Sequence, residues 1–423
     1  MNNFKKLSQK TIATTIFASV LILSLLFSCF FVKSPAKVNA DETAFTRVEH
    51  YEFNNANNLG KDSLGNYNLT NKGGVVYDEE NDGVTVGTDS DCVLYSPKDG
   101  SGKDLSDYIT GSYSLSIRAR LTSVTSGTKL LVSTGYAQNY SVFSIQRAFG
   151  SLHFNTGINT IEVPVGLNST PTWCRITVIY SADTETSTYT YRIVISTEAG
   201  YSYDQTHTLT GSVKFGGYYQ AEFCIGGAMR SLENNANFLA TEATVSDVRV
   251  YSGVLSDKEV DAIDREDMDN LAKKNLATNS EIIGASIRLA EESGLRFHAN
   301  MAESVIANYV TKYGVENVTF GTYIVRNHNG QNAYAFVPAV NNTLTDGVYS
   351  FNAVITGLTS EYYGTDYTAY VYIAYTVDGV TTYVKAESGV TRSISYVAQV
   401  LLDKNDDTLS EGIVKQLQAF IGQ

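Results

Sequence analysis

Three carboxylates stand close together near the middle of the chain, Glu259, Asp261 and Asp264 in the segment EVDAID. On a β-strand, residues two apart point to the same face of the sheet. Two carboxylic acids on one face can flank a glycosidic bond and hydrolyse it. On a helix, Glu259 and Asp261 lie about 200° apart around the axis and cannot share one site. The local structure of this segment therefore decides whether it could act on a glycan.

The residues before EVDAID favour a helix. The strand-like run SDVRVY is followed by Ser256, a helix N-cap residue, and Glu259 completes a capping box three residues later. Val260 and Ile263 then follow at helical spacing. We therefore predict a solvated helix instead of an active site. Because the chain also lacks HExxH, G-x-S-x-G, phosphate-loop and GxGxxG motifs, we predict that it is not an enzyme, and keep a glycoside hydrolase or lyase as an alternative.

The N-terminus has the features of a secretion signal. A lysine-containing start is followed by an apolar stretch over residues 11–32 and by small residues at Val38 and Ala40. We predict a signal peptide over residues 1–40, with cleavage before Asp41, and hence a secreted, extracellular protein. An uncleaved membrane anchor is the alternative, since the apolar stretch is long enough to span a bilayer.

The composition excludes some partners. The 423 residues carry a net charge of −13, which argues against binding to nucleic acid or to an anionic membrane surface. Neutral glycans and basic proteins remain as partners. The predicted mature chain keeps Cys92, Cys174 and Cys224, an odd number that cannot form a closed disulfide framework. A bridge between Cys174 and Cys224 is one interpretation, and buried thiols are the one we favour.

Alternation of apolar and polar residues predicts a mainly β fold. Runs of this kind, separated by Gly, Asn, Asp and Ser, indicate a β-sandwich over residues 41–263. The clearest are residues 113–121, 141–147, 151–156, 173–181, 191–196 and 245–251.

We place a charged linker at 264–280 and a smaller α+β domain, rich in strands, at 281–423. In this second domain, residues 304–314 have helical spacing before a glycine, and Asp378–Gly379 predicts a hairpin turn.

The first domain resembles the concanavalin A-like, laminin-G-type jelly rolls. The resemblance spans Val48 to Ile263 and rests on YEFNNANNLGKDSLGNYNLTNKGGV, GVTVGTDSDCVLY, SYSLSIRARL, WCRITVIYS and SDVRVYSGVLSDKEVDAI. It implies two curved antiparallel sheets, often a structural Ca²⁺, and a glycan- or protein-binding role. The second domain resembles an uncharacterised C-terminal module of secreted clostridial-type proteins, through GASIRL, SGLRF, FGTYIV, YTAYVYIAY and VTRSISYVA.

Two aspartates are candidate ligands for that calcium ion. Asp247 lies in SDVRVY, and Asp62 lies in an N-terminal segment that the family places near the last strand. Carboxylate and backbone oxygens suit Ca²⁺. The alternative for each is an aspartate that caps a turn.

The candidate glycan-binding residues combine loop tyrosines with polar strand residues on one presumed outward face. They are Tyr136, Tyr140, Tyr218, Tyr219, Arg118, Arg120, Gln146, His153 and Asn155. Each also has a purely structural interpretation, because tyrosine is a good strand residue. We interpret Trp173 as core packing. Tyr370 and Tyr372, in the second domain, share one face of their strand and either bind glycan or pack against helices.

The sequence thus predicts a secreted, non-catalytic, lectin-like protein. Its predicted partners are polysaccharides or glycoconjugates, and cell-surface proteins. The alternative function is an adhesive or structural extracellular protein that binds other proteins, because one fold can serve both roles.

Overall fold

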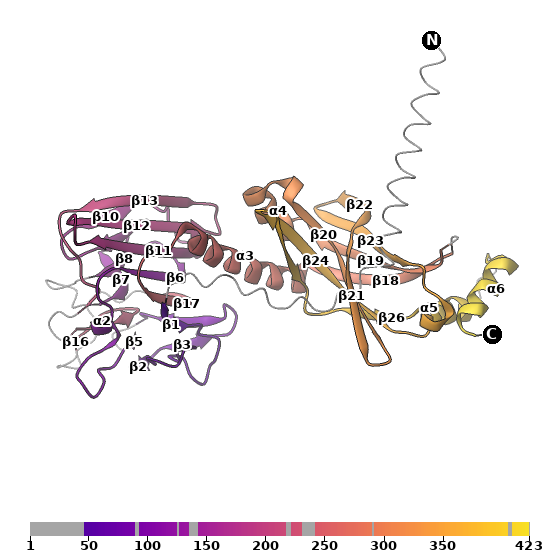
Figure 1. Ribbon diagram of the computed structural model, residues 1–423, viewed down its shortest axis with the longest axis horizontal. Coiled ribbons are helices and arrows are strands. Elements are labelled where there is room, and N and C mark those ends of the chain that lie inside the picture. Colours follow the sequence, from indigo (N-terminus) through magenta and orange to yellow (C-terminus); the bar gives the residue numbers. More distant parts are fainter. Residues whose placement is uncertain are drawn as a thin grey trace, which may run out of the picture. The chain divides into compact units, whose positions relative to one another are not determined.

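The computed structural model describes residues 46–88, 93–124, 127–134, 143–216, 221–230, 242–289, 292–404 and 408–422. The chain divides into two compact units, which we call the N-terminal unit (Ala40–Asp264) and the C-terminal unit (Arg265–Gln423). Both are built mainly of antiparallel strands (Figure 1), so the predicted mainly β fold class is confirmed. The predicted signal peptide lies outside the described residues.

The N-terminal unit has two main sheets in its described part. The first has the order β13 (Ser202–Leu209), β12 (Thr188–Thr197), β11 (Thr172–Asp183), β6 (Tyr113–Leu121), β17 (Ala243–Ser252), β4 (Gly83–Val86) and β3 (Val76–Asp78), with β1 (Thr46–Tyr51) also paired to β17. The second has the order β10 (Thr160–Val163), β9 (Ser151–Asn155), β8 (Ser144–Ala148), β7 (Thr128–Ser133), β15 (Cys224–Ile225), β5 (Leu94–Tyr95) and β2 (Thr70–Asn71). Shorter elements are α2 (Leu105–Tyr108), β14 (Ala221–Glu222) and β16 (Met229–Arg230).

One hydrophobic core lies between these sheets. Leu115 and Ile117 of β6 meet Leu152 and Phe154 of β9 in it, and all four are fully buried. Because successive strand residues point to opposite faces and Ala119 and Leu121 also belong to this core, Arg118 and Arg120 of β6 point outward. Cys174 and Cys224 are buried thiols, as we favoured, and Cys92 lies outside the described residues.

The segment EVDAID is helical, as predicted. Helix α3 (Asp257–Asn279) starts after Ser256, whose backbone N–H and hydroxyl both donate to the Glu259 carboxylate at 2.7 Å. Val260 and Ile263 pack onto the outer side of the first sheet. The helix runs on to Asn279 through the stretch in which we predicted a linker.

The C-terminal unit is a second sandwich closed by short helices (Figure 1). One sheet has the order β18 (Ser280–Arg288), β19 (Gly294–Ala302), β23 (Val348–Thr356) and β22 (Val340–Thr345). The other has the order β21 (Gln331–Pro338), β20 (Val318–His328), β24 (Tyr367–Val377) and β25 (Val380–Lys385), with β26 (Val390–Arg392) also paired to β24. The helical elements are α4 (Ser304–Tyr313), η1 (Val315–Asn317), η2 (Ser360–Tyr362), α5 (Ile394–Asp403) and α6 (Glu411–Phe420).

The two sheets of this unit share their core. Phe297 and Phe351 from the first sheet and Ile324 and Ile373 from the second are buried in it. The predicted turn is present, because Asp378 and Gly379 take φ values of 51° and 78° between β24 and β25. Among the described residues, no helix is long and apolar enough to cross a membrane.

Candidate functional site

Six aromatic side chains gather on the outer face of the sheet formed by β20, β21, β24 and β25. We call this surface the outer aromatic face, and its members are Tyr323, Tyr334, Phe336, Tyr370, Tyr372 and Tyr383. On β24 the alternate residues Ala369, Val371 and Ile373 belong to the cores, so Tyr370 and Tyr372 between them point away from the interior. The face therefore results from period-two alternation repeated on four neighbouring strands.

The register of the strands brings these rings together. Tyr323 on β20 lies opposite both Phe336 on β21 and Tyr370 on β24. Its ring centroid is 4.7 Å from that of Phe336 and 6.0 Å from that of Tyr370. Directly opposed aromatic side chains stabilise a sheet, by about 0.2–1 kcal/mol per pair. The rings thus form a continuous layer across three strands.

Small residues widen that layer to a fourth strand. Tyr372 lies opposite Gly321, and Tyr383 lies opposite Ala374. This leaves space above the sheet, and Phe336 and Tyr383 stack at 3.8 Å between centroids although two strands separate them. The interplanar angle is 23°, so these two rings lie nearly parallel.

The aromatic layer is separate from the cores of the unit. None of its six rings belongs to the buried clusters of the described C-terminal unit, and Tyr383 is 45% exposed. Tyr372 is buried beneath the layer, and the other four rings are half-buried. Tyr370 and Tyr372 were predicted either to bind glycan or to pack against helices. They point outward, and the helices contribute to the cores behind the sheet.

The surroundings of the rings are polar and nearly uncharged. Exposed threonine pairs flank them, with hydroxyl separations of 2.8 Å for Thr368 and Thr391 and 2.9 Å for Thr376 and Thr381. Among the described strand residues that point outward from this sheet, Lys385 carries the only charge. Its Nζ lies 5.1 Å from the centroid of Tyr370, within cation–π distance.

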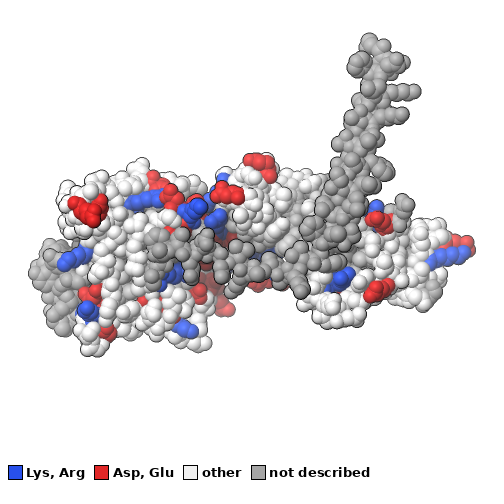
Figure 2. Space-filling model, in the orientation of Figure 1, with Lys and Arg blue, Asp and Glu red and all other residues white. Residues whose placement is uncertain are grey.

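Such a surface suits a flat ligand with one apolar side and many hydroxyls. A pyranose ring has this character, since its C–H groups can lie against an aromatic face while its hydroxyls reach hydrogen-bonding groups around that face. The threonine hydroxyls can both donate and accept such hydrogen bonds. On the side of the molecule seen in Figure 2, the charged residues are interspersed among wide uncharged areas.

The strand residues predicted to bind glycan in the N-terminal unit do not share one face. Arg118 and Arg120 belong to β6 in the first sheet. Gln146 and His153 are paired neighbours on β8 and β9 in the second sheet, and Asn155 lies on β9. Because the core lies between the sheets, the two groups point to opposite sides of the sandwich, and the single presumed face is wrong.

Trp173 is not in the core. Its neighbour Cys174 points inward, so Trp173 points outward, where it is half-buried. The guanidinium of Arg118 lies 4.2 Å from its ring centroid and also pairs with Glu198 at 2.9 Å. The interpretation as core packing was therefore wrong. The loop tyrosines Tyr136, Tyr140, Tyr218 and Tyr219 lie outside the described residues.

Asp247 is the centre of a buried charge network. It lies 2.5 Å from Nη1 of Arg175, 2.9 Å from Nε of Arg249 and 2.7 Å from Nε2 of His50. Burial raises the pKa of this carboxyl, but Arg175 together with His50 and Arg249 outweighs burial and holds the pKa well below its ordinary value. Two guanidinium groups already neutralise the carboxylate, which argues against Asp247 as a calcium ligand.

Asp62, the other predicted calcium ligand, is surrounded by N–H donors. The backbone amides of His50 and Leu64 donate to Oδ1, and those of Asn66 and Tyr67 donate to Oδ2. This is the turn-capping alternative for Asp62. Among the described residues, no group of three or more His, Cys, Asp or Glu side chains could hold a metal ion. Calcium binding stays a prediction. It requires ligands other than Asp247 and Asp62, because ion pairs and N–H donors already engage these two carboxylates.

Glu49, which was not singled out from the sequence, lies against Asp62. Its side chain is fully buried and its oxygens find no well-aligned N–H or O–H donor among the described residues. Burial and the neighbouring Asp62 raise the pKa of Glu49 to about 10. Burial also acts on Asp62, but its hydrogen bonds with Glu49 and the backbone amides lower its pKa. Glu49 therefore keeps its proton at neutral pH and donates it to the Asp62 carboxylate.

We expect Glu49→Gln to stabilise the N-terminal unit at pH 7. The folded state binds a proton that the unfolded chain, with a carboxyl pKa near 4.5, has released, so stability falls as pH rises from 4.5 towards 10. Glutamine supplies the hydrogen without this penalty, and the expected gain is about 1–3 kcal/mol at pH 7. Urea unfolding at pH 7 and pH 4 measures it. A gain of equal size at both pH values would show that the proton is not involved.

A scan against protein-family models and a search of curated proteins found no match. Among solved structures, the binding domain of botulinum neurotoxin serotype D/C VPI 5993 is 10% identical with a TM-score of 0.38, over 78% of this chain and 85% of that one. The botulinum neurotoxin DC binding domain in complex with SialylT is 12% identical with a TM-score of 0.38, over 82% and 92%. The binding domain of Paraclostridial Mosquitocidal Protein 1 is 13% identical with a TM-score of 0.33, over 83% and 91%.

These structural neighbours are themselves binding domains, most of them of clostridial neurotoxins. TM-scores below 0.5 fall short of a common fold. The laminin-G resemblance of the first domain stays a prediction, and the function proposed next rests on the side chains of this chain.

Proposed function

We propose that this protein is a secreted, non-catalytic carbohydrate-binding protein that holds neutral polysaccharide on the outer aromatic face of its C-terminal unit. The observation that supports this most strongly is the layer of six aromatic rings on the outer face of the sheet, with Tyr383 45% exposed among the described residues. Interior packing of the described unit does not require this layer, because the cores lie on the other side of the sheet.

The near absence of charge on this face indicates the class of glycan. Among the described strand residues that point outward here, the one cation is Lys385, whose ammonium group is directed over Tyr370 and Tyr323. A strongly anionic polysaccharide would need several cations on the face, and the net charge of −13 would repel it. A neutral glycan needs only rings to stack on and hydroxyls to bond with, and the threonine pairs supply the latter.

In this proposal the N-terminal unit is a laminin-G-like lectin module that serves the same role. Its candidate residues are Gln146 and His153 on one outer face of the sandwich, and Trp173 and Arg118 on the other. Secretion follows from the predicted signal peptide. The alternative is an adhesive protein that binds protein partners through these faces, since aromatic surfaces also serve protein interfaces.

Pull-down of the full chain on insoluble polysaccharides, together with a glycan array, tests the proposal. We expect retention on at least one neutral polysaccharide and no release of reducing ends. Retention is expected to persist in EDTA, because the outward strand residues of the aromatic face include no Asp or Glu to hold calcium.

Three results would count against this account. Absence of binding to every glycan, with calcium supplied, would contradict carbohydrate binding. Binding that EDTA abolishes would place the glycan elsewhere than on the aromatic face. Release of reducing ends would favour the alternative that the protein is a glycoside hydrolase.

A further inference from the structure

The outer side of the sheet formed by β18, β19 and β23 in the C-terminal unit is a polar surface. Phe297 of β19 and Ala353 of β23 belong to the core, so the residues that alternate with them point away from it. We call this surface the outer polar face, and its central members are Ser286, Arg288, Arg296, His298 and Asn352. Because the core lies between the two sheets, this face and the outer aromatic face point to opposite sides of the unit.

Arg296 lies near the centre of the outer polar face. It is paired with Ser286 on one side and with Val354 on the other, and it is half-buried. Its Nε is buried without an acceptor among the described residues, and no carboxylate of the described chain pairs with its guanidinium. By contrast, the outward Arg192 of β12 pairs with Asp204 at 2.7 Å. Buried polar atoms of native proteins nearly always have a hydrogen-bond partner, so Arg296 is well suited to bind an anion from outside the chain.

Next to Arg296, three hydrogen-bonding side chains form a row across the strands. Oδ1 of Asn352 can only accept, so Nδ1 of His298, 2.6 Å away, carries the proton. Nε2 of His298 then accepts a hydrogen bond from the Ser286 hydroxyl at 2.8 Å. This row holds its members in place and leaves two groups for a ligand, the N–H donors of the Asn352 amide and a lone pair of the Ser286 oxygen.

Two glycines leave space beside Arg296. Gly284 lies opposite His298, and a Cβ added there would meet no atom within 4 Å. Gly294, the neighbour of Arg296 on the same face of β19, has no side chain either. Arg288 and Arg296 are diagonal neighbours in the strand register, and at about 7–8 Å such positions are within reach of long side chains. A ligand held by Arg296 therefore lies close to a second cation.

The charge around Arg296 is positive. Among the described strand residues that point outward from this sheet, the charged ones are Arg288, Arg296 and Glu281. Glu281 lies opposite Asn300, whose amide donates to it at 3.5 Å. Asn300 is four residues from Arg296 along β19, a separation of roughly 13 Å. The whole chain carries −13 and would repel a long polyanion, whereas the local cations attract a single carboxylate.

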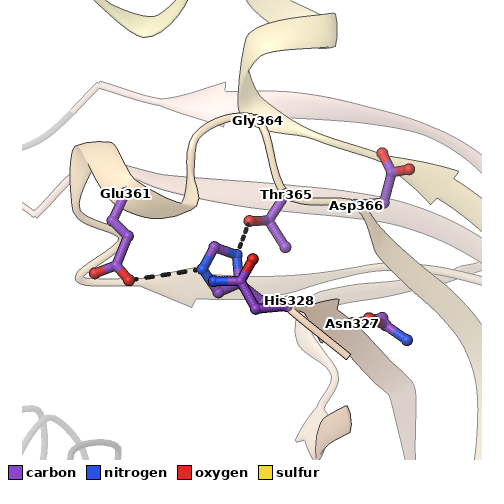
Figure 3. A pocket seen from close by; sticks show the side chains of 7 residues that line it. Asn327, His328, Glu361, Gly364, Thr365 and Asp366 are labelled. Carbon is purple, nitrogen blue, oxygen red and sulfur yellow. Dashed lines mark hydrogen bonds and ion pairs between the residues drawn. The ribbon is translucent and has the colours of Figure 1, made fainter. Parts of the chain in front are cut away.

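An open pocket of about 530 Å³ at one end of β20, in the same unit, is different (Figure 3). Its histidine, His328, is already engaged, with Nδ1 2.8 Å from the Thr365 hydroxyl and Nε2 3.6 Å from Oε1 of Glu361. Asp366 lies on the other side of His328 from Glu361, and the two carboxylates are directed away from each other. The lining of this pocket therefore does not converge on one charged group, as the donors around Arg296 can.

We propose that the outer polar face binds an acidic sugar of the uronic acid type. The Arg296 guanidinium and the Asn352 amide hold its carboxylate, and the Ser286 oxygen accepts from one of its hydroxyls. A guanidinium binds a carboxylate through two parallel N–H···O bonds, which are among the stronger hydrogen bonds of proteins. The site goes beyond the proposed function, because it lies on the opposite sheet and does not depend on the neutral polysaccharide of the outer aromatic face. Its ligand is a glycoconjugate that carries a single acidic residue.

NMR titration of the full chain with glucuronic acid tests the site, read at the Arg296 Nε–H and the Asn352 side-chain amide. We expect both resonances to shift, and binding about tenfold or more tighter than that of glucose, acetate or the methyl ester of glucuronic acid. Equal binding of the ester would overturn recognition of the carboxylate, and equal binding of acetate would overturn recognition of the sugar. Tighter binding of a neutral-ended peptide with one aspartate would indicate a protein partner instead. Absence of any shift at the two side chains would overturn the site.

Two variants of Arg296 separate its charge from its shape. Arg296→Gln should reduce the affinity for glucuronic acid to that for the methyl ester. Arg296→Lys keeps the charge but loses the planar fork, so we expect it to bind about tenfold more weakly than the wild type. A lysine variant that binds as tightly as the wild type would overturn the two-bond arrangement.

Lys415→Gln is the matched control, because it removes one exposed positive charge on α6 of the same unit. It should leave binding of glucuronic acid within about twofold, since exposed charges at a distance are screened. An equal loss in the control and in Arg296→Gln would mean that net charge, and not the outer polar face, attracts the ligand. Tyr370→Thr/Tyr383→Thr should bind glucuronic acid as the wild type does, so failure of this site and failure of the proposed function are separate results.

Discussion

Replacing Asp247 with asparagine is expected to lower the free energy of unfolding of the N-terminal unit by about 3–5 kcal/mol. The side chains of Arg175 and Arg249 are each only 4% exposed, and both pair with this one carboxylate. Asparagine would remove the carboxylate that both buried guanidinium groups share, and loss of one partner of a buried ion pair costs far more than loss of an exposed pair.

Urea unfolding followed by tryptophan fluorescence measures this effect. Trp173 is the only tryptophan of the chain and lies in the N-terminal unit, so its signal reports on that unit. The matched control is Asp204→Asn, which breaks an exposed pair with Arg192 and should cost about 1 kcal/mol or less. A loss for Asp247→Asn no larger than that of the control would show that the network is solvated.

The pH dependence of Asp247 has a definite sign. Its pKa is lowered on folding, so its contribution is complete above its ordinary pKa of 3.8 and is lost only as pH falls through the lowered value. We therefore expect the difference between the wild type and Asp247→Asn to be unchanged from pH 8 to pH 5.

The second large effect concerns binding. The double variant Tyr370→Thr/Tyr383→Thr is expected to weaken polysaccharide binding by about 30-fold or more, at about 1–2 kcal/mol for each ring removed from the centre of a contact surface. Threonine is chosen because it favours strands, and both positions lie outside the cores. Affinity electrophoresis or calorimetry with the polysaccharide found in the pull-down gives the ratio of dissociation constants.

Tyr396→Ala provides the control for this variant. Tyr396 is 54% exposed and lies on α5, away from the strands of the face. Its loss should leave binding within about twofold, since surface contacts outside a binding surface contribute little. A double variant that is folded and binds as tightly as the wild type would refute the role of the aromatic face. If the face instead binds a protein over a broad interface, the double variant should keep most of its affinity for that protein. Such a result would favour the adhesive alternative.

Much of the fold was predictable from local pattern. Alternation alone gave the β6 segment 113–121 with its bounds, and the capping box at Ser256 and Glu259 placed the start of α3. These features are set by residues close together in sequence. The turn at Asp378–Gly379 is a further example, because both residues tolerate positive φ.

The candidate sites were less predictable, because they depend on which strands become neighbours. Alternation shows that Arg118 and His153 each point outward, but not that they belong to opposite sheets of the sandwich. In the same way, Asp247 is a plausible metal ligand by residue type, and only the pairing of β17 with β6 and of β6 with β11 puts Arg175 beside it.

The outer aromatic face was only partly visible in the sequence. Tyr370 and Tyr372 share a face of one strand, and that was recognised. The stacking of Phe336 on Tyr383 joins β21 and β25, which have two strands between them, and needs the small residues Gly321 and Ala374 on those strands. A tyrosine-rich pattern alternating on several strands is the signal that could have been followed further.

The most direct test is an NMR titration of the full chain, labelled on its tyrosine rings, with an oligosaccharide of the polysaccharide found in the pull-down. We predict that the ring resonances of Tyr323, Tyr334, Tyr370, Tyr372 and Tyr383 shift together, with one dissociation constant, and that those of the N-terminal unit change little. Shifts confined to tyrosines outside this face, with these five unchanged at saturation, would contradict the proposal that the outer aromatic face binds glycan.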